Sequence, residues 1–289
     1  MGAERVLAGA LLVVAGWARA IDVAPLWDHA QPAISEERFR AAMTSATGDD
    51  ALILQTQIAR TYVFRKDFGR ARELLGEVAG KFDAAGPEAQ ARYWLELGRT
   101  YASHQHPPET QTSDVKRMAH DAFSRALQIA RQARLDAVAI DALHKFPFVD
   151  TAPADQLRWT QQALALVEAS DQASAKRWEP SIRSNIGEAL RDLGRHGEAL
   201  EQFKRALALY EQETDERSIR DAHWQVARTL RALNRIDDAL AIQLRVEREN
   251  DAAGAPKAYV FEELELLYQA KGDGERARHY AGRTRSLSK

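Results

Sequence analysis

Arginine recurs in this sequence directly after small residues, a placement that suits the binding of anionic groups. Such pairs occur at 59–60, 98–99 and 227–228. Two more arginines, Arg191 and Arg231, lie one helical turn after the small residues at 187 and 227. A guanidinium can bind a carboxylate or a phosphate through two parallel hydrogen bonds. The alternative is that arginine is simply a good helix former on an exposed face. The candidate residues for such binding are Arg60, Arg99, Arg191, Arg228 and Arg231, with Trp224, Tyr259 and Leu95 as apolar contacts.

Side chains that could catalyse a reaction or hold a metal do not form a recognisable motif. The eight histidines include no H-E-x-x-H pair. His104 and His106 would need a third ligand, such as His120 or Asp114, to bind a metal. The alternative, an exposed polar loop, fits an isolated H-x-H better. We therefore expect no metal site, no cofactor and no enzymatic activity.

Glycines at 272 and 274 match half of a dinucleotide-binding fingerprint. They follow a predicted helix, whereas that fingerprint must follow a strand. The fingerprint also requires an acidic residue on a second strand to bind a ribose, and the sequence predicts no such residue here. This segment is therefore interpreted as a turn between two helices.

Composition narrows the possible partners. The chain has 289 residues, with 40 basic and 42 acidic side chains and a formal charge of −2. This balance gives no bulk electrostatic reason to bind nucleic acid or an anionic membrane. The absence of cysteine excludes disulfides, iron–sulfur clusters and thiolate zinc sites.

The first twenty residues have the layout of a secretory signal peptide. Arg5 precedes an uncharged, mostly apolar run over 6–17, and Ala18-Arg19-Ala20 gives an A-x-A cleavage site before Ile21. A helix over that run is about 18 Å long, too short for a bilayer core of about 30 Å. We expect export to the periplasm or beyond, with no membrane span after cleavage. The alternatives are a buried N-terminal helix and an uncleaved membrane anchor.

The remainder of the chain has the periodicity of paired amphipathic helices. Within 182–210, apolar and small residues mark one helix face up to Leu190, a Gly-containing turn follows, and Ala199, Phe203 and Ala206 mark a second face. Neither helix could bury its apolar stripe alone, so the two should pack as a hairpin. The same pattern recurs along the chain, and the small first-helix residue precedes the second-helix alanine by 12 positions in three copies: 59 to 71, 187 to 199 and 227 to 239.

This pattern resembles the tetratricopeptide repeat (TPR) family over about residues 50–289. The residues that carry the resemblance are the Trp-x-x-Leu-Gly-x-x-Tyr run at 94–101 and the Ala-x-x-x-Phe-x-x-Ala runs at 119–126 and 199–206. The resemblance implies an all-α solenoid, a right-handed superhelix of antiparallel helix hairpins. In such a fold, Gly or Ala at 59, 98, 187 and 227 would let the paired helices approach closely.

The expected organisation is a leader over 1–20, an irregular segment and a capping helix over 21–49, and a repeat array over 50–289. Ser35 is expected to cap the helix over 36–47. The copies recur near every 39–40 residues rather than 34, as in the long-period variants of the family. The copy over 133–175 has almost lost its signature. The six copies are expected at about 50–85, 88–131, 133–175, 178–215, 218–252 and 256–289.

The resemblance also indicates where a partner would bind. In that family the first helix of each hairpin lines a concave surface, and the arginines that follow the small residues would face it. We therefore expect a non-catalytic scaffold or adaptor that holds a protein or peptide segment, acidic in character, in this groove. The alternative is a ligand-gated sensor or regulatory subunit that acts on a separate effector.

Overall fold

The computed structural model describes residues 20–287, and these residues form helices joined by turns, with no strand among them. The all-α prediction is therefore confirmed. The predicted leader over 1–20 lies outside the described residues, apart from Ala20.

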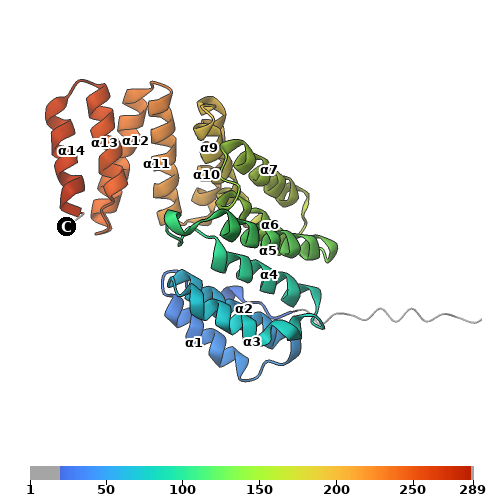
Figure 1. The fold of residues 1–289 in the computed structure, drawn as a ribbon. Helices are drawn as coiled ribbons and strands as arrows, with labels where there is room; N and C mark the ends of the chain where they lie inside the picture. Colours follow the sequence, from blue (N-terminus) through green and yellow to red (C-terminus); the bar gives the residue numbers. More distant parts are fainter. Residues whose placement is uncertain (1–19, 288–289) are drawn as a thin grey trace, which may run out of the picture.

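Most of the helices pack in consecutive antiparallel pairs (Figure 1). The six pairs are α2 (Gly48–Phe64) with α3 (Phe68–Phe82), α4 (Pro87–Tyr101) with α5 (Ser113–Gln132), α6 (Asp136–Leu143) with α7 (Pro153–Ala169), α9 (Glu179–Asp192) with α10 (His196–Glu213), α11 (Glu216–Ala232) with α12 (Ile236–Ala252), and α13 (Ala258–Ala270) with α14 (Gly274–Leu287). The remaining elements are η1 (Ala24–Leu26), α1 (Pro32–Met43), η2 (Pro108–Thr110), η3 (Phe146–Phe148) and α8 (Ala173–Lys176). Each hairpin packs on its neighbours, so stability comes from a series of interfaces.

The array changes direction near its middle. In Figure 1 the hairpins from α9 to α14 stand side by side, whereas α1 to α5 lie across them below. The change occurs at α6 and α7, in the copy with the weakest sequence signature. Helix α6 has only 8 residues, and the 3₁₀ turn η3, which contains Pro147, follows it.

Close helix packing depends on glycine at two equivalent positions, as the sequence predicts. A Cβ atom added to Gly98 would lie 2.4 Å from the ring of Phe123, and one added to Gly187 would lie 2.7 Å from the ring of Phe203. Both rings are buried. Any side chain at either position would push the second helix of the hairpin away from the first.

Four of the six hairpin turns share one backbone feature. A residue with positive φ follows the first helix at Lys66 (63°), Gly194 (73°), Asn234 (59°) and Gly272 (75°). Glycine adopts this left-handed conformation without strain, whereas lysine does so at a cost. The residue type therefore fits the conformation best in the two turns that have glycine.

The N-terminal segment differs from the prediction. Helix α1 begins at Pro32 rather than at residue 36, because proline at the first helical position is already set for the helical φ. Ser35 is not a cap. It is buried within α1, where its Oγ accepts a hydrogen bond from the Asp28 amide (2.7 Å) and donates one to the Asp28 carbonyl oxygen (3.0 Å). Residues 21–31, here called the N-terminal strap, lie against α2, where Trp27 Nε1 donates to Gln57 Oε1 (3.0 Å).

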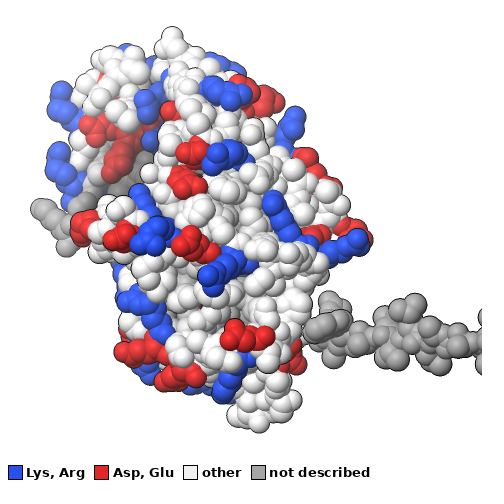
Figure 2. Space-filling view, turned by 45° about the vertical axis from the view of Figure 1, so that its right-hand side comes forward, with Lys and Arg blue, Asp and Glu red and all other residues white. Residues whose placement is uncertain are grey.

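Acidic and basic side chains are interspersed over the surface in view in Figure 2, with uncharged surface between them. Neither sign dominates that face, in keeping with the near-neutral formal charge. In the described part of the chain, no helix is both long and apolar enough to cross a membrane.

Candidate functional site

The candidate residues lie on the first helix of each hairpin, on α2, α4, α9 and α11. We call the side of the array formed by α2, α4, α6, α9, α11 and α13 the first-helix face. The structure divides the candidates into two groups with different surroundings. The charged side chains of one group bind other side chains inside the protein. The side chains of the other group lie at an open cleft.

Arg99 is buried, with only 5% of its surface exposed, so its guanidinium is not available to a ligand outside the protein. Its Nε lies 2.9 Å from Glu96 Oε2, and its Nη2 donates to Asp141 Oδ2 on α6. Burial alone would raise the pKa of Asp141, but the nearby cations, Arg99 foremost, hold that pKa below its ordinary value. The expectation that Arg99 offers its guanidinium to a ligand therefore conflicts with its burial and pairing.

Lys145 completes this group of charges beside Asp141. Its Nζ lies 3.6 Å from Asp141 Oδ1 and 3.2 Å from His144 Nδ1. Burial, reinforced by the Arg99 cation, lowers the pKa of Lys145 to about 7. Burial and Lys145 also hold the pKa of His144 well below 6.5.

Arg60 is the outermost member of the same group, with 18% of its side chain exposed. Its Nη1 lies 4.0 Å from both Glu96 Oε1 and Asp141 Oδ2. Its guanidinium carbon lies 5.0 Å from the ring centre of Trp27 and 5.7 Å from that of Phe64, a cation–π arrangement. Arg60, Glu96, Arg99, Asp141 and Lys145 together form what we call the charge network, which joins α2, α4 and the end of α6.

Two further candidates connect neighbouring hairpins. Arg231 binds Glu263 on α13 through two hydrogen bonds of 2.6 and 3.1 Å, and Glu263 is buried. Arg191 Nη1 donates to Gln225 Oε1 (2.7 Å), and its Nε lies 3.5 Å from Asp192 Oδ1. The Arg231 guanidinium is therefore already occupied, and Arg191 is partly so. Leu95, expected as an apolar contact, is buried in the core at 2% exposure.

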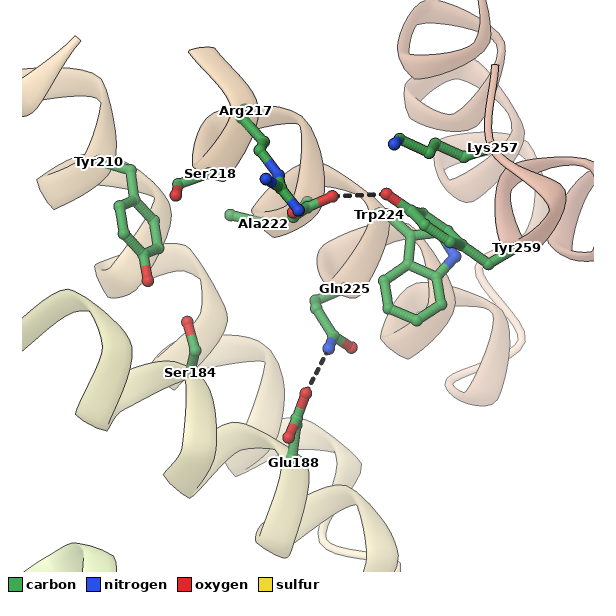
Figure 3. Close-up of a pocket in the computed structure, with 11 residues that line it drawn as sticks. Ser184, Glu188, Tyr210, Arg217, Ser218, Ala222, Trp224, Gln225, Lys257 and Tyr259 are labelled. Carbon is green, nitrogen blue, oxygen red and sulfur yellow. Dashed lines mark hydrogen bonds between the residues drawn. The ribbon is translucent and has the colours of Figure 1, made fainter. Parts of the chain in front are cut away.

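An open cleft of about 390 Å³ lies on the first-helix face between α9, α11 and the start of α13 (Figure 3). We call it the C-terminal cleft. It is lined by Ser184, Glu188, Tyr210, Arg217, Ser218, Asp221, Ala222, Trp224, Gln225, Lys257 and Tyr259.

Aromatic rings form one wall of the C-terminal cleft. The rings of Trp224 and Tyr259 lie 4.7 Å apart between centres, and the Arg228 guanidinium carbon lies 5.3 Å from the Trp224 ring centre. Trp224 Nε1 is buried and has no hydrogen-bond acceptor within the described residues. Protein atoms cover this N–H, so the surface that Trp224 offers to the cleft is its aromatic ring.

Hydrogen bonds fix the two carboxylates of the cleft. Tyr259 Oη donates to Asp221 Oδ1 (2.5 Å), and Gln225 Nε2 donates to Glu188 Oε1 (2.6 Å). Burial, together with Asp221, raises the pKa of Tyr259, so its hydroxyl stays protonated. Burial also raises the pKa of Glu188. Both carboxylates therefore serve to position neighbouring side chains.

Three cations at the cleft have no such partner. Arg217, Arg228 and Lys257 form no salt bridge within 4.0 Å among residues 20–287. In Figure 3, the side chains of Arg217 and Lys257 extend toward the same space from α11 and from the residue before α13. The cleft and its surroundings therefore combine an aromatic wall with cations that form no salt bridge among the described residues.

The sequence-based candidates did not include Arg217 and Lys257. One signal was present for Arg217, because it lies seven residues before Trp224 and Asp221 lies three before it, which places all three on one helix face. Lys257 precedes α13 outside any periodic segment. No helical pattern could have assigned it to the same cleft.

His104 and His106 belong to a structured connection between α4 and α5. The ring of His106 stacks on Phe68 at 3.7 Å, and its Nδ1 lies 2.9 Å from Ser103 Oγ. Burial lowers the pKa of His106. Within the described residues, no group of three or more His, Asp or Glu side chains is arranged to hold a metal ion.

Comparison with known proteins supports the fold. Residues 178–248, which span α9 to most of α12, match the tetratricopeptide repeat family model. No curated protein matches the sequence. Several solved structures have the same kind of fold.

The signal transduction ATPase with numerous domains from Pyrococcus horikoshii, a protein with a tetratricopeptide repeat sensor, aligns with a TM-score of 0.67 and 13% identity, over 89% of this chain and 39% of that one. RapI in its apo form aligns with a TM-score of 0.65 and 12% identity, over 90% and 71%. Aspartyl phosphate phosphatase F from Bacillus subtilis aligns with a TM-score of 0.58 and 16% identity, over 88% and 65%. Residues 178–248 therefore carry tetratricopeptide repeats, and the described chain has the fold of a TPR-like all-α solenoid.

Proposed function

We propose that this protein is a non-catalytic TPR scaffold that binds an extended, acidic peptide or protein segment in the C-terminal cleft. The observation that carries the proposal is the aromatic wall of Trp224 and Tyr259 beside cations without a salt bridge, Arg217, Arg228 and Lys257. A peptide can supply apolar side chains for the wall and carboxylates for the cations.

The dimensions and lining of the cleft suit a few residues of a peptide. Its volume of about 390 Å³ lies at the small end of the range for ligand sites, about 300–1,000 Å³. Trp224 and Tyr259 offer flat apolar surface of the kind that anchors peptide side chains. The carboxylates Glu188 and Asp221 are held by Gln225 and Tyr259, so they leave the cations available.

The chemistry of the lining favours binding over catalysis. No histidine is among the described residues that line the cleft, so the Ser184 hydroxyl has no imidazole base there. The raised pKa of Tyr259 keeps its hydroxyl in the neutral, unreactive form. These features support a scaffold rather than an enzyme.

We further propose that the chain is exported and acts in the periplasm. The layout of residues 1–20 supports this, since a short apolar run precedes the A-x-A sequence Ala18-Arg19-Ala20. In that compartment, the partner would be an exported protein or a peptide. Retention by an uncleaved N-terminal segment is the alternative arrangement.

A ligand-gated sensor is the second candidate function. The fold of the chain resembles that of an ATPase with a tetratricopeptide repeat sensor, and the cleft is compact enough for a small anion-bearing molecule. A thermal-shift screen separates the two functions. A sensor should be stabilised by a compact ligand, whereas a scaffold should respond only to peptides.

The direct test of the scaffold proposal is selection of a phage-displayed random heptapeptide library on three proteins. These are the wild type, a cleft variant (R217Q, R228Q and K257Q) and a control variant (K204Q, R205Q and R248Q) with the same loss of charge on α10 and α12. We expect acidic peptides to be enriched on the wild type and the control but not on the cleft variant. Equal enrichment on all three would contradict the proposal.

A further inference from the structure

The N-terminal strap begins with a polar contact to α2. The Ile21 backbone N–H donates a hydrogen bond to Asp50 Oδ1 (2.9 Å), in the first turn of α2. Ile21 is also the residue that cleavage after Ala20 would make the first of the chain. The contact therefore involves the nitrogen that such a cleavage would convert from an amide to an amine.

The surroundings of this nitrogen are acidic. Ala20, Asp49, Asp50 and Glu88 are among the residues that line a cleft of about 720 Å³, and no lysine or arginine of the described chain lines it. Asp49 Oδ2 accepts the Gly86 amide (2.9 Å), and Glu88 pairs with Arg92 (2.8 Å). Asp50 has no cationic partner within 4.0 Å among residues 20–287. Asp49 likewise has no cationic partner among the described residues, but Asp50 is the carboxylate that accepts the Ile21 N–H.

We propose that cleavage of the Ala20–Ile21 bond creates an α-ammonium on Ile21 that forms a salt bridge with Asp50 and anchors the N-terminal strap to α2. The inference rests on the proposed export, because a leader peptidase must supply the cleavage. Water attacks the Ala20 carbonyl carbon, the C–N bond breaks, and Ala20 leaves as a carboxylate. The Ile21 nitrogen keeps the bonding electron pair and gains two protons, so a neutral donor becomes a cation in the same place.

The salt bridge would fix the strap over the charge network. Val23 is buried, and Trp27 both donates to Gln57 and covers the Arg60 guanidinium. Only five residues separate Ile21 from Trp27, so a salt bridge at Ile21 restricts the positions that Trp27 can take. Processing of the leader would thus complete the packing of the N-terminal half of the first-helix face.

The titration of the amine tests the salt bridge. The chain from Ile21 onward is produced by removing a fusion tag that leaves no extra residue, and the amine is followed by NMR after ¹³C-dimethylation. The charged groups that face it are Asp22 of the strap, Asp49 and Asp50 of α2, and the Glu88–Arg92 pair of α4. We expect the amine to titrate clearly above the usual value of about 8.

Two matched substitutions in α2 assign the effect to one carboxylate. D50N should restore the usual value, because it removes the charge that faces the amine. D49N should change the titration of the amine less, because Asp49 binds the Gly86 N–H rather than the Ile21 nitrogen. The side-chain amide oxygen that D49N introduces can still accept the Gly86 N–H. An amine that titrates near 8 both with and without D50N would overturn the proposal.

Acetylation of Ile21 provides a matched stability control, because it restores an amide N–H and removes the charge. D50N should lower Tm by about 2–4 °C in the free-amine chain and by clearly less in the acetylated chain. Equal shifts in both would show that the charge contributes nothing. The N-terminal sequence of the exported protein tests the cleavage separately, so failure of export and failure of the salt bridge can be told apart.

Discussion

Two groups of cations, one in each half of the first-helix face, serve opposite purposes. In the N-terminal half, Arg99 and Lys145 are buried against Glu96 and Asp141. In the C-terminal half, Arg217 and Lys257 line an open cleft and Arg228 lies beside its Trp224 wall, and these three form no salt bridge with any described residue. Arginines at equivalent positions of the repeat, such as Arg99 and Arg228, therefore serve different purposes.

The difference follows from what the neighbouring hairpin supplies. Asp141 on the short helix α6 reaches Arg99 from 42 positions away, and its carboxylate neutralises the cation inside the protein. Arg228 meets no carboxylate within 4.0 Å among the described residues; its guanidinium lies near the ring of Trp224, on which Tyr259 of the neighbouring helix packs. A repeat position thus acquires its role from the adjacent hairpin, and the following predictions test that contrast.

The largest effect is expected from removing the carboxylate at the centre of the charge network. D141A leaves Arg99 and Lys145 buried with too little negative charge, so the free energy of unfolding should fall by about 3–5 kcal/mol. Urea denaturation followed by circular dichroism measures it. D221A, in the C-terminal cleft, should cost much less, since Asp221 only accepts a hydrogen bond from Tyr259 at a partly exposed site. Equal losses would remove the proposed contrast.

Packing, unlike charge, should matter equally in the two halves. F203A empties the space against Gly187, and F123A does the same against Gly98. Each should lower the free energy of unfolding by about 3–5 kcal/mol, as truncation of buried aromatic residues does. Thermal and urea unfolding check this. An unchanged Tm for F203A would show that its ring does not support the hairpin.

Acid should loosen the C-terminal half through His223. This side chain is 9% exposed and hydrogen-bonds to Arg245, and burial with the Arg245 cation lowers its pKa to about 4. As pH falls from 6.5 to about 4, the unfolded chain takes up a proton that the folded chain does not. Stability should therefore fall across this window, by at most about 3 kcal/mol.

The control for this titration is H223Q, which removes the ionisable group. Chemical denaturation at several pH values should show a flatter dependence for this variant between pH 6.5 and about 4. His144 remains in both proteins, so its own contribution cancels in the difference. Identical pH profiles would contradict the assignment to His223.

A matched pair of tryptophan substitutions separates a binding side chain from a structural one. W27F removes an indole N–H that donates to Gln57, so it should cost about 1 kcal/mol of stability. W224F removes a buried donor without an acceptor, so stability should hold or rise, while the smaller aromatic wall should lower peptide affinity about three- to tenfold. Urea denaturation and peptide titration measure the two effects. A loss of stability in W224F with unchanged affinity would reverse the interpretation.

The smallest effect concerns the hairpin turns. Lys66 has φ of 63° at the place where Gly194 has φ of 73°. K66G should raise the free energy of unfolding by about 0.5–1 kcal/mol, and G194A should lower it by about 1 kcal/mol, because only glycine adopts this conformation without strain. Differential scanning calorimetry would detect both. Shifts of the same sign would be inconsistent with equivalent turns.

The sequence predicts the hairpins well because their information is local. The sequence pattern predicted a close approach of the paired helices at small residues such as Gly187, and the ring of Phe203 packs against that glycine. Ser35 failed as a predicted cap because Pro32, an equally local signal, already starts the helix. The leader, the domain limits and the groove as a binding site stay predictions.

The candidate site was less predictable because it depends on contacts between distant repeats. Burial of Arg99 requires Asp141, which lies in the copy with the most eroded signature. Lys257 joins Arg217 at one cleft only once α11 and α13 are packed. Periodicity indicates which face a residue occupies, but it does not indicate which partner the next hairpin provides.

The most direct test of the account is the affinity of one selected acidic peptide, measured by fluorescence anisotropy. The peptide should bind the cleft variant (R217Q, R228Q and K257Q) at least about tenfold more weakly than the wild type, since charge-assisted hydrogen bonds are lost. The control variant (K204Q, R205Q and R248Q) should bind with unchanged affinity. Equal affinity in all three proteins would contradict the claim that the C-terminal cleft binds the partner.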